Sequence, residues 1–336
     1  MTNKIIPLKI AGVGYSVPET VITNDDLTKL YETSDEWIST RTGIKERRVV
    51  SGNQDASDLG YEAAKSALEK ACIKPEELDL IIAASSAPPD LYPAIACHMQ
   101  SRLGITTNIP AFDITAACSG LIYGLQIARG FIGSGIYKKI LIVATDNNSR
   151  LVNWEDRSTS ILFGDGAGAM VVTEAQDGID DILSINIQAD GSIGEYITLS
   201  IPGKNCPLVE PNTQKDSHIY MNGKEVYKFV VKVLPQYIDK SLADAGLTPE
   251  DVDYLIPHQA NQRIIDAVQQ RLGYDDSKVI SNIAYYGNTS AASIPIALAE
   301  GVEKGRIKLN STAILCGFGA GMTWGAAIVR LREGIC

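Results

Sequence analysis

The chain of 336 residues is 45% hydrophobic and 21% charged, with a formal net charge of −10. This length can bury a large core, as one domain or as two packed halves, and the composition is that of an ordinary soluble protein. The acidic balance argues against general binding to nucleic acid or to an anionic membrane, although a local basic patch could still receive an acidic partner.

Neither a secretion signal nor a membrane span is predicted. The apolar run at 4–11 is short, is interrupted by Pro7 and continues into Gly12. The cysteines are scattered, no metal-binding spacing occurs, and a chain of this length does not need disulfides. They are Cys72, Cys97, Cys118, Cys206, Cys316 and Cys336. We therefore expect a cytoplasmic protein without a bound metal.

Short apolar segments alternate with stretches of helical periodicity along the chain. In the first half, strands are predicted at 8–14, 78–84, 111–114, 139–144 and 167–173, and helices at 58–71, 95–103 and 121–133. In the second half, strands are predicted at 182–189, 254–257, 279–283, 312–316 and 326–331, and helices at 224–245, 262–272 and 291–303. This alternation favours mainly parallel sheets covered by helices.

The two halves of the chain resemble each other in sequence. The segment 71–82 matches 245–256 in residue class and order, each with a helix end, a proline turn and a buried strand. The pattern Gln-x-Arg-Leu-Gly at 100–104 recurs at 269–273, where the glycine closes a helix. Three ordered matches, the third described next, make chance similarity improbable.

The third match is between two glycine-rich runs, 164–168 and 317–321. We therefore predict an internal duplication with halves at 1–174 and 175–336, packed as a layered α/β structure. Such a structure would hold its active site at the junction of the halves. The run 164–168 lacks the G-x-G-x-x-G spacing and leads into a strand, so a dinucleotide site is disfavoured and tight turns are favoured.

Cys118 is the first candidate for chemistry. It lies between the predicted strand ending at 114 and the predicted helix starting at 121. A thiol at a helix N-terminus is favoured as thiolate by unpaired N–H groups and the helix dipole, which makes it a candidate nucleophile. A lone Cys is more often a small buried hydrophobe, and for the run alone that structural role is favoured.

His258 and Asn288 are the second and third candidates. His258 follows a predicted strand, and Asn288 lies in a small-residue turn that enters a helix, at about the place that Cys118 has in the first half. Alone, each suits a structural role, as a hydrogen-bonded His or as an N-cap. Together with a thiol, they could support acyl transfer followed by carbanion chemistry, because two N–H donors can stabilise an enolate oxygen.

The chain resembles the bacterial 3-oxoacyl-[acyl-carrier-protein] synthase III family of the thiolase-like superfamily over nearly its whole length. Six motifs in order carry the resemblance: Thr33 to Ile38 with Arg41 to Ile44, Ala116 to Cys118, Phe163 to Gly168, Pro257 to Asn261, Gly287 to Ala292, and Thr323 to Gly325. The resemblance implies a thiolase-like fold of two duplicated βαβαβαββ-type halves in a layered αβαβα arrangement.

The resemblance also implies a reaction. Cys118 would take an acyl group from a short acyl-CoA such as acetyl-CoA. His258 and Asn288 would stabilise the enolate formed when malonyl-ACP loses carbon dioxide, and backbone N–H groups of Cys118 and Ala320 would hold the acyl oxyanion. The products would be 3-oxoacyl-ACP, carbon dioxide and CoA, with no cofactor.

Substrate contacts follow from the same resemblance. The CoA-binding residues would be Trp37, Arg41, Arg157 and Asn261, with the adenine between Trp37 and Arg157. Acyl carrier protein (ACP) would bind Gln259, Ala260, Asn261, Gln262, Arg263, Lys228 and Arg271. The primer pocket would be lined by Phe163, Phe318 and Tyr92, the last reaching across a homodimer interface. Gln270 replaces a basic residue of some relatives, and residues 204–217 have no counterpart in the resemblance.

Four other kinds of protein are considered beside this family. A condensing enzyme or acyltransferase of specialised metabolism, of polyketide or quinolone type, would use the same three residues. A catalytically silent carrier-binding protein is disfavoured by the complete set. Thiolase itself is disfavoured because Cys316 lies within a predicted strand, and elongating synthases are disfavoured because Asn288 stands where they have a second His.

Overall fold

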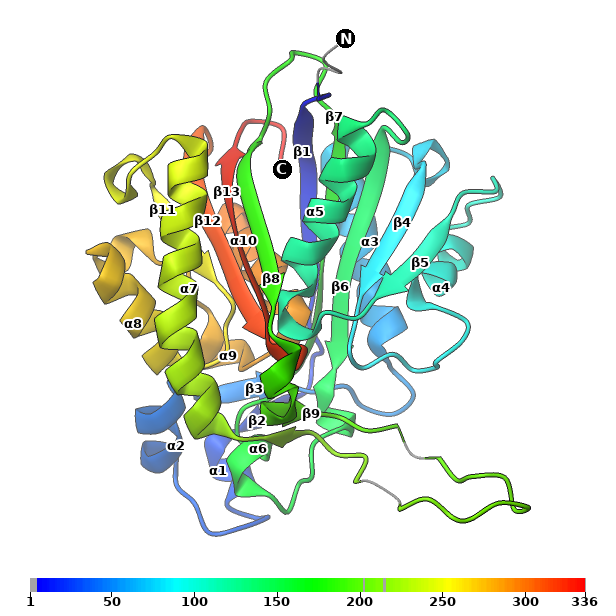
Figure 1. The fold of residues 1–336 in the computed structure, drawn as a ribbon, viewed down its shortest axis with the longest axis vertical. Helices are drawn as coiled ribbons and strands as arrows, with labels where there is room; N and C mark the ends of the chain where they lie inside the picture. The colour runs from blue at the N-terminus through cyan, green and yellow to red at the C-terminus, as the bar shows by residue number, and fades with distance from the viewer. Residues whose placement is uncertain (1–4, 202, 214–215, 336) are drawn as a thin grey trace.

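The computed structural model describes residues 5–201, 203–213 and 216–335, and two sheets with the same internal order form its framework (Figure 1). The first sheet has the order β1-β7-β6-β4-β5 and the second β8-β13-β12-β11. The strands of the first sheet are β1 (Leu8–Ser16), β7 (Asp165–Glu174), β6 (Lys139–Asn147), β4 (Leu80–Ala84) and β5 (Ala111–Ile114). Those of the second are β8 (Ile182–Ala189), β13 (Thr323–Leu331), β12 (Ser311–Gly319) and β11 (Tyr254–Pro257).

One strand in each sheet runs against the others. β7 pairs antiparallel with β1 and β6, and β13 pairs antiparallel with β8 and β12, whereas the remaining neighbours are parallel. The sheets are therefore mixed, and the prediction of mainly parallel pairing is wrong for β7 and β13. For β13 the cause is local: only the 3-10 helix Ala320–Met322 joins β12 to β13, and a connection that short permits only an antiparallel return.

Two of the three sequence matches are structural repeats. In each half, a 3-10 turn, Pro75–Glu77 or Pro249–Asp251, precedes the strand β4 or β11. The following carboxylate, Asp79 or Asp253, accepts a hydrogen bond from a backbone N–H at the start of β6 (Lys139) or β12 (Thr312), at 2.9 and 2.8 Å. Gly104 and Gly273 both close helices with a positive φ, of 71° and 70°.

The third match is not a structural repeat. Residues 164–168 open β7, whereas 317–321 close β12, and β12 is the counterpart of β6. The glycines of the two runs therefore serve different contacts. The strand predicted at 279–283 is also wrong, because only Val279 forms a bridge, parallel to Leu255 of β11, before a helix begins at Ile283.

Helices separate and cover the sheets in five layers (Figure 1). The outer face of the first sheet is covered by α3 (Ala56–Ala71) and α4 (Ile95–Arg102). Between the sheets lie α5 (Gly120–Gly133) and α10 (Ser293–Glu303), each packed on strands of both. The outer face of the second sheet is covered by α7 (Gly223–Ala245), with α8 (Gln262–Leu272) beside it.

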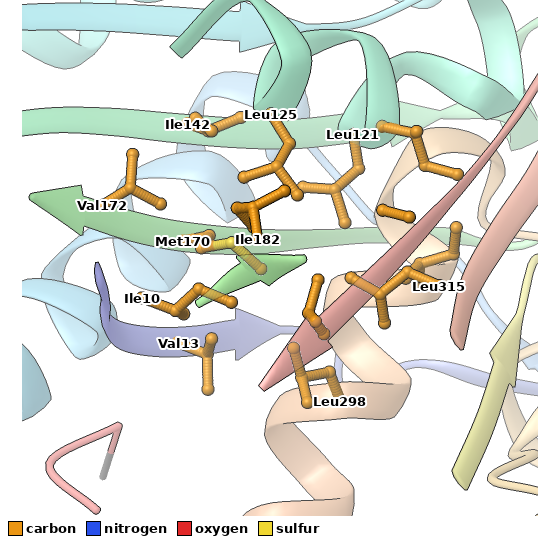
Figure 2. Packing of buried hydrophobic residues seen from close by; sticks show 14 of the residues in the cluster. Ile10, Val13, Leu121, Leu125, Ile142, Met170, Val172, Ile182, Leu298 and Leu315 are labelled. Carbon is orange, nitrogen blue, oxygen red and sulfur yellow. The ribbon is translucent and has the colours of Figure 1, made fainter. Parts of the chain in front are cut away.

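The main hydrophobic core lies in the layer between the sheets (Figure 2). Leu121 and Leu125 of α5 and Leu298 of α10 pack with Met170 of the first sheet and Leu315 of the second. These side chains are fully buried, and burying one of their size stabilises a fold by about 1.5–3 kcal/mol. Because one core joins both halves, the ends of α5 and α10 are held in fixed positions relative to each other.

Smaller elements surround the ends of the central helices. They are α1 (Asn24–Leu27), α2 (Asp35–Thr42), α6 (Arg157–Ser160), α9 (Ile283–Tyr286), the hairpin β2 (Val21–Thr23) with β3 (Glu46–Arg48), and the pair β9 (Ile197–Thr198) with β10 (Tyr220–Met221). The long polar stretches 17–55 and 147–160 supply α1, α2 and α6. In 204–217 the described residues are almost all exposed, and residues 214 and 215 lie outside the described part.

Five of the cysteines lie in the described part of the chain and all are free: Cys72, Cys97, Cys118, Cys206 and Cys316. Cys336 lies outside the described residues. Within the same described ranges, no helix has the length and apolar character to cross a membrane, and no group of three side chains could hold a metal ion.

Candidate active site

One cavity of about 560 Å³ brings the three candidate residues together. Cys118 comes from the connection between β5 and α5, His258 directly follows β11, and Asn288 precedes the short turn that leads into α10. The cavity wall is mostly apolar and also includes Phe163, Phe318, Ala320, Arg41, Asn261, Lys228 and Arg263. The junction of the two halves is therefore a partly open, mostly apolar pocket for a reacting thioester.

Backbone geometry fixes the position of Cys118. Ala117, the residue before it, has a φ of +45°, which aims the following residue into the cavity at the start of the 3-10 helix Ala117–Ser119. At Gly120, an added Cβ would lie 2.8 Å from the Ala84 Cβ and 3.2 Å from that of Ala291. The small residues let the start of α5 press against β4 and against the turn from the second half.

The same turn occurs in the second half. Ser290 has a φ of +54° and opens the 3-10 helix Ser290–Ala292 before α10. By backbone conformation the counterpart of Cys118 is therefore Ala291, and Asn288 lies three residues earlier. The predicted match of Asn288 with Cys118 is corrected accordingly, while the meeting of the two helix starts is confirmed by contacts between the two turns.

The protonation state of Cys118 differs from the sequence prediction. Burial raises the pKa of the thiol to about 12, the hydrogen bond to Ser290 works against this rise, and the nearby Asp146 carboxylate adds to it. The residue itself is half-buried at the cavity, and the loss of water around its sulfur raises the pKa by more than the hydrogen bonds lower it, whereas the sequence predicted a lowering by a helix N-terminus. The thiol is neutral at pH 7 and needs a base to become a nucleophile.

His258 is a neutral donor. It is buried, and burial lowers its pKa to about 3. Its Nδ1 lies 2.7 Å from Ser293 Oγ, which accepts a hydrogen bond from the Gln259 backbone N–H at 3.3 Å. Because the Ser293 hydroxyl accepts from Gln259, its own proton is free to be donated to Nδ1 of His258. The neutral imidazole then carries its proton on Nε2, and Nε2–H is the donor that faces a ligand. The ring of Phe318 packs edge-on, with centroids 5.3 Å apart.

Asn288 is held by its backbone and by its side-chain oxygen. Its N–H donates to Leu162 O at 2.8 Å, and its carbonyl accepts from Gly164 N at 3.0 Å. Its Oδ1 accepts from the Ser290 N–H at 2.8 Å. Because the oxygen is used inside the turn, the side-chain NH₂ is the group free to donate to a ligand.

The predicted oxyanion hole has a tight backbone contact. Gly319, at the end of β12, approaches Cys118 so closely that a Cβ on it would lie 2.5 Å from the Cys118 nitrogen. Ala320 follows in the 3-10 helix Ala320–Met322 and lines the cavity. Donors placed in this way can stabilise a developing oxyanion without reorganising.

Three of the predicted CoA residues, Trp37, Arg41 and Arg157, form a cationic stack, and Arg41 also lines the cavity. The half-buried Trp37 ring lies 4.2 Å from the Arg41 guanidinium carbon and 4.3 Å from that of Arg157. An adenine between Trp37 and Arg157 needs about 7 Å, twice the usual separation of stacked carbon atoms, so Arg157 would have to move outward. Asn261 caps α8 and lines the cavity.

The predicted carrier-protein residues separate into exposed and buried groups. Lys228, Arg263 and Arg271 are exposed, with Lys228 paired to Glu225 and Arg271 to Asp239. Ala260, Asn261 and Gln262 are half-buried at the start of α8.

Gln259 is a correction to that set. It is buried, donates to Pro257 O at 2.6 Å and accepts from Ser281 Oγ at 2.8 Å. Its side chain hydrogen-bonds neighbouring loops beneath the surface and is not exposed to a docked protein.

Of the predicted primer-pocket residues, Phe163 and Phe318 are buried and line the cavity. Tyr92 does not line the cavity of its own chain and exposes 86% of its surface. Sequence reasoning missed Asp146, Ser290 and Ser293, which surround the reactive groups with hydrogen bonds. The run Thr-Ser-Ala-Ala-Ser after Asn288 held two hydroxyls of this network, but nothing in it indicated their partners.

Two family models match the chain. The model of 3-oxoacyl-[acyl-carrier-protein (ACP)] synthase III matches residues 112–191, and that of its C-terminal part matches residues 242–331. Among curated proteins, the beta-ketoacyl-[acyl-carrier-protein] synthase III of Caldanaerobacter subterraneus is 48% identical, covering 96% of this chain and 97% of its own.

Solved structures agree. The 3-oxoacyl-[acyl-carrier-protein] synthase III of Aquifex aeolicus is 44% identical with a TM-score of 0.88, covering 96% of this chain and 99% of its own. A priming beta-ketosynthase from the R1128 polyketide biosynthetic pathway is 31% identical with a TM-score of 0.89, covering 98% of each chain.

The fold and the site thus define a condensing acyltransferase of the thiolase-like class, as the sequence resemblance predicts. Within that class, the chain belongs to the 3-oxoacyl-[acyl-carrier-protein] synthase III family.

Proposed function

We propose that this chain catalyses the initiating condensation of type II fatty acid synthesis, using a short acyl-CoA such as acetyl-CoA and malonyl-ACP. The observation that supports it is the meeting of Cys118, His258 and Asn288 in one mostly apolar cavity, each held by its own backbone or side-chain contacts. A thiol and two N–H donors are the groups that thioester exchange followed by enolate chemistry requires.

In the first half-reaction, Cys118 Sγ attacks the acyl-CoA carbonyl carbon. The oxyanion that forms is held by the N–H groups of Cys118 and Ala320, the carbon–sulfur bond to CoA breaks, and CoA leaves with a proton. The Cys118 acyl thioester remains in the cavity. Arg41, Asn261 and the Trp37–Arg157 pair would hold the CoA at the mouth.

In the second half-reaction, the malonyl thioester loses carbon dioxide. His258 Nε2–H and Asn288 NH₂ would donate to the thioester oxygen as it becomes an enolate oxygen. The enolate carbon attacks the acyl carbon on Cys118, a carbon–carbon bond forms, and the Cys118 thiolate leaves and regains a proton. The products are 3-oxoacyl-ACP and carbon dioxide, with CoA from the first step and no cofactor.

The partners belong to the same proposal. ACP would dock where Lys228, Arg263 and the start of α8 border the cavity, since exposed cations steer an acidic partner. A homodimer would place the exposed Tyr92 against the partner's primer pocket. The division at 174/175, which falls between β7 and β8, and the cytoplasmic location stay predictions.

The test separates the half-reactions. Protein incubated with acetyl-CoA should carry one acetyl group on the peptide containing Cys118, while the exposed thiols Cys72 and Cys206 serve as internal controls and stay free. H258A and N288A should still acylate Cys118 but lose most decarboxylation of malonyl-ACP. Absence of acylation with every short acyl-CoA would refute the proposal, and equal loss of both half-reactions would refute the division of roles.

A second test concerns the metabolic setting. Turnover with malonyl-ACP should exceed that with malonyl-CoA and with acceptors that are not carrier-bound. Preference for another acceptor would instead place the chain with the specialised-metabolism relatives, of which the polyketide priming enzyme is one example.

A further inference from the structure

Asp146 is a buried carboxyl group that the proposed reaction leaves without a role. It lies at the end of β6 and is fully buried. Its Oδ1 accepts hydrogen bonds from the backbone of Ser86 and Ala87, at 2.7 and 3.0 Å, and from Ser85 Oγ at 3.1 Å. Its Oδ2 accepts from the Ala291 N–H at 3.3 Å. A carboxyl group that accepts hydrogen bonds from several neutral donors is held in one orientation, and the donors stabilise its negative charge inside the protein.

Ser290 connects this carboxyl group to the nucleophile. Cys118 Sγ donates to Ser290 Oγ at 3.3 Å, and Asp146 lies next to Ser290, because its Oδ2 accepts from the N–H of the following residue, Ala291, at 3.3 Å. The backbone of Ser290 is fixed by its bond to Asn288 Oδ1 and by the turn at φ +54°. Thiol, hydroxyl and carboxyl group therefore follow one another from the reacting sulfur into the protein.

We propose that Ser290 and Asp146 form a proton relay that deprotonates Cys118 during acylation. The thiol proton passes to Ser290 Oγ as the hydroxyl proton passes to Asp146 Oδ2. At the same time Sγ bonds to the acyl carbon, the carbon–sulfur bond to CoA breaks, and the proton returns through Ser290 to the departing CoA thiolate. The inference rests on the proposed function and assigns the base of its first half-reaction.

The competing base is His258, and its environment makes it the weaker one. Burial lowers the pKa of His258 to about 3, so the imidazole resists taking a proton at pH 7. Burial raises the pKa of Asp146 to about 6, which leaves it ionised at pH 7 and still a stronger base than an exposed carboxylate. A thiol whose pKa burial raises to about 12 requires such a partner.

The groups that face Asp146 are otherwise neutral. From the loop after β4 these are Ser85 and two backbone N–H groups, and from the turn before α10 they are Ser290 and the Ala291 N–H. Cys118 is the titratable group at the other end of Ser290. Asp165 of β7 is paired with Asn147, not with Asp146, so strand alternation puts its side chain on the opposite face of the sheet.

The experiment compares three variants by rapid-quench measurement of Cys118 acylation from acetyl-CoA between pH 5 and 10. S290A removes the bridging hydroxyl, and S290G does so with a residue that a φ of +54° favours, in case alanine impairs folding. S85A is the matched control, because it removes another hydroxyl from Asp146 without contacting Cys118. Thermal unfolding verifies that each variant is folded.

We expect wild-type acylation to fall as the pH drops through the pKa of Asp146. S290A and S290G should be slower by about 10²-fold at pH 7, lose that acid limb, and gain rate toward alkaline pH as the thiol ionises by itself. S85A should keep both the rate, within about threefold, and the acid limb.

Three results would overturn the relay. The first is acylation of the Ser290 variants at the wild-type rate. The second is slow acylation of the Ser290 variants that keeps the acid limb, and the third is an equal loss of rate in S85A. The second and third results would both indicate that these hydroxyls only support the structure. A wild-type protein that never acylates would instead refute the proposed function, so the two failures are distinguishable.

Discussion

The contact between Gly319 and Cys118 makes the oxyanion hole sensitive to a single methyl group. In G319A the new Cβ would lie 2.5 Å from the Cys118 nitrogen and 2.8 Å from the Ala117 Cβ. Carbon atoms in contact usually keep about 3.5–4.0 Å, so the backbone at Cys118 must shift by roughly 1 Å. The strain of such overpacking costs about 1–3 kcal/mol of stability.

The larger effect should be on catalysis. A shift of that size removes the Cys118 N–H from its place on the acyl oxyanion, and loss of one such donor slows acyl transfer by about 10²–10³-fold. The assay is single-turnover acetylation of Cys118, followed by mass spectrometry, beside the thermal unfolding temperature.

The matched control is G130A in α5, where an added Cβ meets nothing within 4 Å. It should acylate normally and gain about 0.5–1 kcal/mol of stability, because alanine is the better helix residue. If G319A acylated Cys118 within threefold of wild type, the proposed placement of the oxyanion hole would be wrong.

Three further predictions concern pH and substrates. Because the pKa of His258 is lowered to about 3 in the folded protein, unfolding takes up a proton below pH 6.5, so stability is lost toward acid by up to about 1.4 kcal/mol per pH unit. In urea unfolding, the free energy of unfolding of H258Q should fall less toward acid pH than that of wild type. Asp146, whose pKa is raised, has the opposite pH dependence, but it is present in both proteins and cancels in the comparison. Equal pH dependence in the two proteins would contradict the prediction. R157A should raise KM for acetyl-CoA severalfold but leave acetyl-pantetheine, which lacks adenine, unchanged; equal effects on both would exclude adenine stacking. R263E should raise KM for malonyl-ACP about tenfold, and by more at low salt. R271E should raise KM less, because Arg271 already pairs with Asp239. A larger increase for R271E than for R263E would show that ACP docks elsewhere.

Periodicity predicted most of the fold because the strands are short, apolar and bounded by turns. It failed at 279–283, an apolar run in which backbone pairing stops after Val279 and the chain turns into a helix at Ile283. Run length alone cannot distinguish these outcomes. The sequence also could not show that β7 and β13 are antiparallel to their neighbours, since the apolar pattern of a buried strand is the same in either direction.

The reactive groups of the candidate site could be predicted because each lies in a recognisable sequence motif. The thiol, the imidazole and the amide were found in this way, and they do meet in one cavity. What determines their protonation was not predictable, because burial and partners far apart in sequence decide it. Asp146 is 144 residues from Ser290 in the chain, and its carboxyl group becomes part of the site only when the two halves pack.

The duplication explains why one site can perform two kinds of chemistry. Each half contributes a turn with a positive φ, at Ala117 and at Ser290, and the two turns press together through the small residues Gly120 and Ala291. The same backbone places a thiol in the first half and a hydroxyl in the second within 3.3 Å of each other. A side chain at Gly120 would meet Ala291 of the second half and, more closely, Ala84 of β4, so the reacting sulfur and the hydroxyl keep their separation only while this contact stays small.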